Sequence, residues 1–269
     1  MSDKDTNEDK VEALVREPLT PMPVVNALTF DGLRACLSNG ISDFRKATMF
    51  GLFFGGVFAL GGIFIIQSLL VWKKIWMIYP VMISFPLIGP FAAVGLYEVS
   101  RRLQTGQPLA WNEILSVVWN QASRELRWMA FVMLFVFWIW MYQVRLLIAL
   151  ILGQMSFSTW GEFFEIVAFT PQGWTFVIIG HVVGAFLALF LFSITVVSFP
   201  ILLERDIDFI TAMITSVSTV FKSPIVMLSW GVFVTLSVMA SFIPAFLGLL
   251  VVLPVLGHAT WHIYKKAVV

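Results

Sequence analysis

Long apolar segments alternate along this chain with short charged breaks. Five stretches carry almost no charge: 48–71, 75–97, 128–152, 174–203 and 225–262. A helix of about 20 apolar residues spans the hydrocarbon core of a bilayer. The last stretch is too long for one such helix, so we expect it to turn near Pro244 and form two. The pattern therefore predicts an all-α fold, a polytopic transmembrane helical bundle with six spans.

A second pattern precedes each pair of spans, in which apolar residues recur at intervals of three and four. It covers 30–46, 111–127 and 210–221. In the first of these segments the apolar positions are Phe30, Leu33, Leu37, Ile41 and Phe44. This spacing places them on one face of a helix, with polar residues on the rest of its surface. We therefore expect three amphipathic helices that lie on the membrane surface or pack under the bundle.

These elements recur in a fixed order, which indicates an internal repeat. The unit of surface helix, span, turn and span covers 28–102, 109–204 and 207–266. The second span of each unit carries a proline: Pro86, Pro200 or Pro254. The first copy is the most elaborate, because Gly89 and Pro90 follow Pro86. Tandem units of one orientation predict a parallel, roughly threefold arrangement, unlike the inverted repeats of many secondary transporters.

The N-terminal segment differs from the rest of the chain in being polar. Residues 1–27 are rich in acidic side chains and lack the apolar core of a signal peptide. Prolines at positions 18, 21 and 23 stiffen the end of this segment. We therefore expect a disordered tail with a proline-rich connector over 1–27, followed by the membrane domain over 28–269.

The composition agrees with a membrane location. The 269 residues are 59% hydrophobic and 12% charged, whereas an average soluble domain is about 25% charged. A net charge of +1 supplies no field to attract nucleic acid, so no nucleic-acid partner is expected. The single cysteine, Cys36, excludes an intramolecular disulfide and a cysteine-rich metal site. The expected partners are membrane lipids and, through helix contacts, a larger membrane complex.

The distribution of charge indicates an orientation in the membrane. Lysine and arginine gather on one side of the six-span topology, and Glu162 and Glu165 lie on the other. Lys73 and Lys74 are the exceptions. By the positive-inside rule the basic side is cytoplasmic. We therefore expect both termini in the cytoplasm.

One motif is similar to a known family. The segment from Phe85 to Pro90, followed by the segment from Gly95 to Arg102, resembles domain-of-unknown-function family 2189, a group of bacterial integral membrane proteins. The resemblance extends over about 28–266. It implies a six-span protein of the bacterial inner membrane, and it supplies no activity, catalytic residue, cofactor or substrate.

The chain has three histidines, and two of them are candidate metal or haem ligands. His258 and His262 are four residues apart and share one face of the last helix. A metal site needs further ligands, and no acidic residue or cysteine lies near them in the sequence. The adjacent Trp261 and Tyr264 favour instead an aromatic belt at the membrane interface. Three histidines are too few for the haem–copper subunit to which some relatives of the family are linked, so we expect no cofactor.

Two further polar residues lie inside predicted spans. His181 stands at mid-depth in the fourth span, where a histidine either serves a function or hydrogen-bonds to a neighbouring helix. Arg145 lies toward the outer end of the third span, and we expect it to reach the interface or to pair with Glu162 or Glu165. A structural role is the favoured interpretation for both residues.

Charged residues close the second span. Glu98 stands three and four residues before Arg101 and Arg102, a spacing that supports a local ion pair. An alternative role for the two arginines is a clamp for anionic lipids. Because the Gly89-Pro90 step is also specific to this hairpin, function is expected to concentrate here.

Motifs for known chemistries are missing from the sequence. It contains no nucleotide-binding glycine loop, nucleophile elbow or His-Glu-x-x-His motif, and no acid–base pair is expected within reach. The sequence favours a non-enzymatic scaffold or accessory factor that acts through helix and lipid contacts. The alternative is a transporter or channel for small molecules or lipids. Its site would lie at the interface of the repeats, where prolines break helices and expose carbonyl groups.

Overall fold

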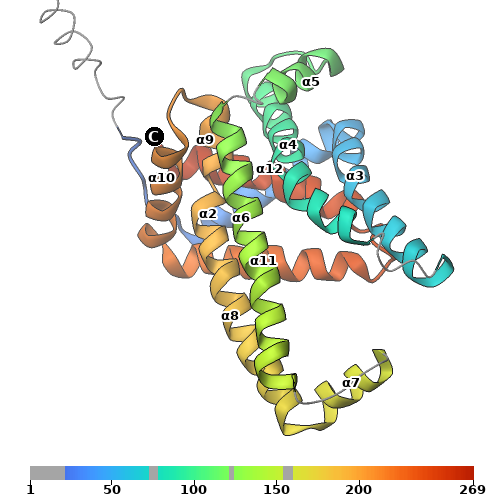
Figure 1. The fold of residues 1–269 in the computed structure, drawn as a ribbon. Coiled ribbons are helices and arrows are strands. Elements are labelled where there is room, and N and C mark those ends of the chain that lie inside the picture. The colour runs from blue at the N-terminus through green and yellow to red at the C-terminus, as the bar shows by residue number, and fades with distance from the viewer. Residues whose placement is uncertain (1–21, 73–77, 121–123, 154–159) are drawn as a thin grey trace, which may run out of the picture.

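The computed structural model describes residues 22–72, 78–120, 124–153 and 160–269 (Figure 1). The helices in chain order are α2 (Phe30–Lys46), α3 (Thr48–Ile66), α4 (Ile78–Thr105), α5 (Trp111–Asn120), α6 (Arg124–Leu147), α7 (Trp160–Phe169), α8 (Pro171–Thr195), α9 (Ser198–Glu204), α10 (Phe209–Lys222), α11 (Pro224–Phe242) and α12 (Leu249–Ala267). Short π-helical turns, Gln67–Val71 and Ile148–Leu152, extend α3 and α6. Within the described ranges the elements are all helical, with one isolated β-bridge, and the all-α prediction is confirmed.

Several of these helices can cross a membrane. Among the described residues, four helical stretches are long and apolar enough: Thr48–Val71, Glu125–Leu152, Pro171–Glu204 and Pro224–Phe242. Neither α4 nor α12 is among them. The second half of α12 carries His258, His262 and two lysines, which lower its hydropathy. The six-span topology and the threefold repeat therefore stay predictions.

Two predicted boundaries are wrong, and a third prediction falls partly on residues outside the described part. α4 does not end at Tyr97 but continues through the charged residues to Thr105, because those charges are paired within the protein. The helix predicted over 111–127 corresponds to α5 as far as Asn120 and to α6 from Arg124, and residues 121–123 between them lie outside the described part. The segment expected as a long loop, 153–173, contains α7.

The bend predicted at Pro200 is present as a break between two helices. The break lies at Val196, four residues before the proline. α8 ends at Thr195 and α9 begins at Ser198. A proline ring clashes with the carbonyl four residues before it and leaves that carbonyl without its helical hydrogen bond. For Pro200 this is the carbonyl of Val196, which lies in the break itself.

α2 and α3 pack one after the other along α12. Gly40 of α2 faces Ala259, and Gly55 of α3 faces Leu249 near the start of α12. A Cβ atom added to Gly40 would lie 2.6 Å from the backbone nitrogen of Ala259. Only glycine allows the two backbones to approach this closely. α12 is therefore the element against which the first two helices are assembled.

The buried face of α2 differs from the predicted one. Its buried residues are Gly32, Cys36, Gly40 and Asp43, each directly preceding a residue of the predicted apolar face. One residue corresponds to a rotation of about 100° around a helix. Small residues occupy the contact because α12 approaches closely, and the larger apolar side chains flank it. Phe30, predicted to be in the apolar face, is 56% exposed.

The two ends of the described chain pair with each other. The backbone N–H of Val24 donates to the carbonyl of Val269 at 3.2 Å, and that of Val269 donates to Val24 at 2.9 Å. Asn26 N–H donates to the carbonyl of Ala267 at 2.7 Å. The end of the predicted 1–27 tail is therefore ordered, while residues 1–21 lie outside the described part. Val24 and Val269 therefore lie side by side.

α6 and α8 form a long hairpin that projects from the other helices, with α7 at its tip (Figure 1). In the most apolar part of the span that includes α6, only 6% of the residues are buried, whereas 39% are buried in the corresponding part of the span that includes α3. The hairpin therefore offers a large apolar surface to lipid or to another protein.

Candidate functional site

A buried polar cluster lies where α2, α4 and α12 meet. Asp43 Oδ2 on α2 accepts hydrogen bonds from Ser100 Oγ on α4 at 2.8 Å and from His262 Nε2 on α12 at 2.7 Å. Ser100 Oγ also lies 2.8 Å from Nδ1 of His258, a second residue of α12. All four side chains are buried. One carboxylate thus links three helices.

Hydrogen bonds around the cluster decide the tautomer of His262. The indole of Trp261 can only donate, and its Nε1 donates to Gln104 Oε1 at 3.0 Å. The amide nitrogen of Gln104 then faces His262 Nδ1 at 3.0 Å and must donate to it. Nδ1 is therefore an acceptor without a proton, and the proton on Nε2 is donated to Asp43. His262 is accordingly a neutral imidazole.

Asp43 is held in its charged form. Burial by itself raises the pKa of this carboxyl group, but hydrogen bonds from His262 and Ser100 outweigh burial and lower the pKa of Asp43 below its ordinary value. The carboxylate is thus ionised at neutral pH, although it lies inside the protein.

His258 is the least satisfied member of the cluster. Because the single hydroxyl proton of Ser100 is donated to Asp43, His258 Nδ1 donates to Ser100 Oγ. Nε2 is then an acceptor, and no described residue donates to it. The carbonyl of Leu96 interacts with the ring, but a carbonyl is itself an acceptor. An unpaired buried acceptor costs about 1–3 kcal/mol, so His258 is a weak point of the cluster.

Two predictions about these histidines are wrong. His258 and His262 do not belong to an interfacial aromatic belt, since they are 0% and 9% exposed. An acid does lie within reach, because Asp43 contacts His262 across 219 positions of the chain. The sequence does contain a signal for Asp43, which follows Gly40 by three residues and Cys36 by seven. It therefore continues a helical stripe of small residues.

We expect the cluster to make the fold sensitive to acid. The folded-state pKa of Asp43 is lowered, so its stabilisation is complete above the ordinary carboxyl pKa of about 4 and is lost as pH falls through the folded-state value. In thermal unfolding experiments in detergent, the midpoint temperature of the wild type should decrease once the pH is lowered below about 4. The midpoint temperature of Asp43→Asn should decrease less over the same pH range. Asp31→Asn, an exposed change on the same helix, should keep the wild-type acid loss. Equal losses in all three proteins would contradict this assignment.

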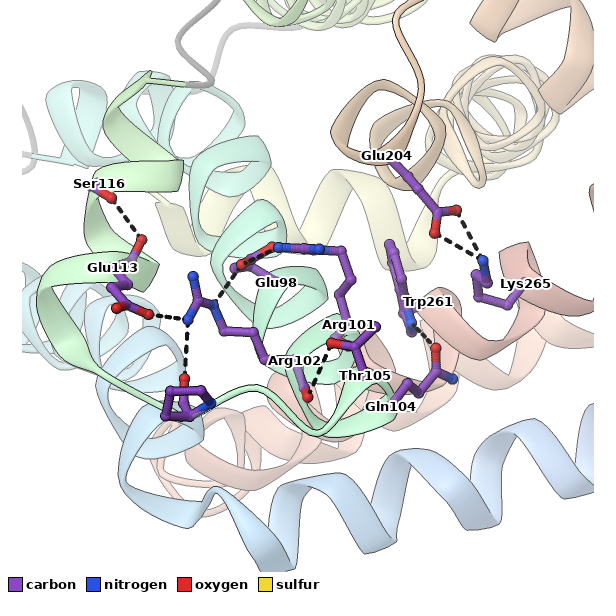
Figure 2. Close-up of polar contacts among 11 residues, drawn as sticks. Glu98, Arg101, Arg102, Gln104, Thr105, Glu113, Ser116, Glu204, Trp261 and Lys265 are labelled. Carbon is purple, nitrogen blue, oxygen red and sulfur yellow. Dashed lines mark hydrogen bonds and ion pairs between the residues drawn. The ribbon is translucent and has the colours of Figure 1, made fainter.

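A second charged cluster lies on α4. Arg101 Nε donates to Glu98 Oε2 at 2.7 Å, and Arg102 Nε donates to Glu98 Oε1 at 2.6 Å. Glu98 is fully buried, and its carboxylate lies between the two guanidinium groups (Figure 2). The local ion pair predicted from the spacing is therefore present.

Arg102 also connects α4 to α5. Its Nη1 donates to the carbonyl of Pro108 at 3.0 Å and pairs with the carboxylate of Glu113 (Figure 2). Both arginines thus have carboxylate partners inside the protein. Paired guanidinium groups are poorly suited to clamp an anionic lipid, so the contacts favour a structural role for this cluster.

The other predicted candidates lie apart from these clusters. His181 is exposed on α8, and its Nδ1 lies 2.7 Å from the carbonyl of Val177 in the same helix, not in a neighbouring one. Arg145 is exposed in the last turn of α6, and its pairing with an acid of the following segment stays a prediction. Pro86 and Pro90 lie within α4, and their side chains are outside the described part.

An apolar cavity of about 570 Å³ lies among five helices. Its lining includes Phe54 of α3, Gly89 of α4, Met133 of α6, Val238 of α11 and Leu253 of α12. Gly89, singled out from the sequence, thus lines a cavity, and a Cβ atom added there would meet nothing within 4 Å. These five helices come from the first, middle and last parts of the described chain. Apart from Gly89, nothing in the sequence pattern distinguished its lining residues from those that face lipid.

The apolar helices and a family match together define the class of this protein. It is an integral membrane protein. Residues 78–204 match the model of the family described as predicted integral membrane protein, DUF2189, so this part of the chain is similar to that family. The match covers the central part of the region in which the resemblance was expected. Comparisons with curated proteins and with solved structures gave no match.

Proposed function

We propose that this protein binds a lipid-like molecule in the central cavity and acts as a carrier or channel for it. The cavity is the observation that carries the proposal. Five helices from different parts of the chain line it, and its volume falls in the range of about 300–1,000 Å³ typical of ligand sites. Its walls are almost entirely apolar, which suits a hydrocarbon chain rather than a charged solute.

The proposal does not include an enzymatic activity. The residues that resemble catalytic groups, Asp43, Ser100, His258 and His262, are buried and hydrogen-bonded mainly to one another. Their geometry supports a role in holding three helices together. None of the four lines the apolar cavity.

A second candidate function is that of a scaffold or accessory factor in a larger membrane complex. The projecting hairpin of α6 and α8 favours it, because so little of the α6 span is covered by the rest of the chain (Figure 1). Helices that associate within a membrane use such apolar faces. Co-purification from mild detergent followed by mass spectrometry would detect a stable partner on this hairpin.

The proposed topology is the six-span arrangement of three tandem units, in a bacterial inner membrane with both termini in the cytoplasm. The backbone pairing of Val24 with Val269 supports it, because the first described residues and the C-terminal residue then lie together. Basic residues lie near those ends as well. Arg205 Nη1 donates to the carbonyl of Val269 at 3.3 Å, and Lys265 pairs with Glu204 (Figure 2).

Filling the cavity tests the carrier proposal. Gly89→Leu adds a side chain where there is open space, so the protein should fold while the cavity volume falls. Native mass spectrometry of protein purified in mild detergent should show an apolar ligand on the wild type and loss of most of it from Gly89→Leu.

The control for this experiment is Gly180→Leu. Gly180 lies on α8 outside the cavity, and the nearest atom to an added Cβ is 3.8 Å away. This variant should retain the ligand. Equal retention by both variants, or a wild-type protein without any bound lipid or apolar molecule, would rule out the carrier function.

A further inference from the structure

A second, polar pocket of about 310 Å³ lies on the other side of the Asp43 cluster from the apolar cavity. It is lined by Asn39, Ser42, Asp43 and Lys46 of α2, Leu103 and Gln104 of α4, and His262 of α12. It shares no lining residue with the apolar cavity. The two are separated along α4 by the turn that carries Ser100. The pocket thus has its own chemistry, set by one acid, one base and several hydrogen-bonding groups.

Asp43 has a free side toward this pocket. Both of its side-chain hydrogen bonds, from Ser100 and His262, go to Oδ2, and no described residue bonds to Oδ1. His262 is neutral, because Gln104 donates to its Nδ1. Among the described residues, the ion-pair contact of Asp43 is with this neutral His262, which approaches Oδ2. A largely buried carboxylate without a cation is unfavourable, and a positively charged ligand would relieve this.

Lys46 supplies the opposite charge at the same pocket. It is exposed one helical turn after Asp43 and makes no ion pair with Asp43 in the described structure. Asn39 and Ser42 add donors on the same helix. An ammonium binding site and an anion binding site therefore stand side by side, at the basic end of the molecule.

We propose that this pocket binds an ammonium–phosphate zwitterion of the ethanolamine phosphate type. The primary ammonium donates to Asp43 Oδ1, and the phosphate is bound by Lys46 with help from Asn39 and Ser42. The same chemistry is presented by the headgroup of phosphatidylethanolamine and by free phosphoethanolamine. A charge-assisted hydrogen bond to a largely buried carboxylate distinguishes such a ligand from phosphatidylglycerol, which lacks the ammonium, and from phosphatidylcholine, which lacks the N–H donors.

Native mass spectrometry of the full chain in detergent with added lipid tests the proposal. The wild type should retain phosphatidylethanolamine about tenfold better than phosphatidylglycerol or phosphatidylcholine. Asp43→Asn should abolish this preference. Equal retention of the three lipids by the wild type, or an undiminished preference in Asp43→Asn, would overturn it.

A surface variant keeps the test decisive if Asp43→Asn does not fold. Lys46→Gln should lower the retention of phosphatidylethanolamine several-fold, whereas Arg45→Gln, an adjacent exposed change outside the pocket, should leave it unchanged. Identical behaviour of the two variants would overturn the proposal. Gly89→Leu should keep the wild-type preference for phosphatidylethanolamine over the other two lipids, because Gly89 lines the other cavity. The experiments can therefore disprove the polar-pocket proposal without disproving the carrier proposal, and the reverse.

Soluble competitors identify the source of the zwitterion. Displacement of the bound lipid by millimolar phosphoethanolamine would support the pocket and show that the free headgroup suffices. Resistance to phosphoethanolamine, together with the lipid preference above, would support a lipid headgroup as the occupant. Displacement by ethanolamine alone, at the same concentration and to the same extent, would overturn the requirement for phosphate.

Discussion

Replacing Glu98 by alanine is expected to lower the free energy of unfolding by about 3–5 kcal/mol, the usual cost of removing one partner from a buried ion pair. Glu98 is fully buried and is the shared acceptor for Arg101 and Arg102 (Figure 2). Without it, the largely buried guanidinium of Arg102 keeps only its contacts to Pro108 and Glu113. The segment joining α4 to α5 should loosen as a result. Equilibrium unfolding in detergent micelles measures the difference.

Glu113→Gln is the matched control for this prediction. Glu113 pairs with the same arginine, but its side chain is 46% exposed. An exposed ion pair contributes about 1 kcal/mol or less, so this variant should unfold close to the wild type. Similar losses for Glu98→Ala and Glu113→Gln would show that burial does not set the strength of this cluster.

Gly40→Ala is expected to destabilise the protein by about 1–3 kcal/mol through overpacking, although alanine is the better helix former. The added Cβ would lie 2.6 Å from Ala259 N and 2.8 Å from Val255 O. Both are backbone atoms of α12, so they cannot move aside as a flexible side chain would. α2 and α12 must separate, which also strains the hydrogen bond between Asp43 and His262. Thermal unfolding followed by tryptophan fluorescence would report the loss.

Gly56→Ala should instead stabilise the protein. Gly56 lies on α3, and the nearest atom to an added Cβ is 3.8 Å away, in the side chain of Leu250. The change therefore brings only the gain in helix propensity, about 0.5–1 kcal/mol. If Gly40→Ala also stabilised the protein, the close approach of α2 and α12 would be wrong.

These two predictions concern the parts of the molecule that position both proposed sites. The packing of α2 on α12 brings Asp43 to the polar pocket. The ion pairs of α4 hold the end of the helix that lines both the pocket and the apolar cavity. Loss of either contact should therefore reduce ligand retention indirectly. For this reason the variants that test the sites, Gly89→Leu and Lys46→Gln, avoid these contacts.

The sequence alone determined the class of the protein and most of its helices. The apolar run predicted as the first span, 48–71, coincides with the stretch Thr48–Val71. The break from Lys222 to Pro224 separates α10 from α11, and Pro224 opens α11 at a position where proline is well tolerated. These features depend only on residues that are neighbours in the chain, so local pattern is sufficient to predict them. The ion pair of Glu98 was predictable for the same reason, because its partners lie within one helical turn.

The tertiary structure alone decided what the polar residues do. Periodicity predicted a helix over 30–46, but the glycine contact with α12 selected a different face and placed Asp43 inside. His262 looked like an interfacial residue because its acid partner is 219 positions away. In a membrane protein, apolar surface is stable against lipid or against another helix, so hydropathy does not say which helices touch. Those contacts, and with them the cavity and the pocket, depend on close packing between distant segments.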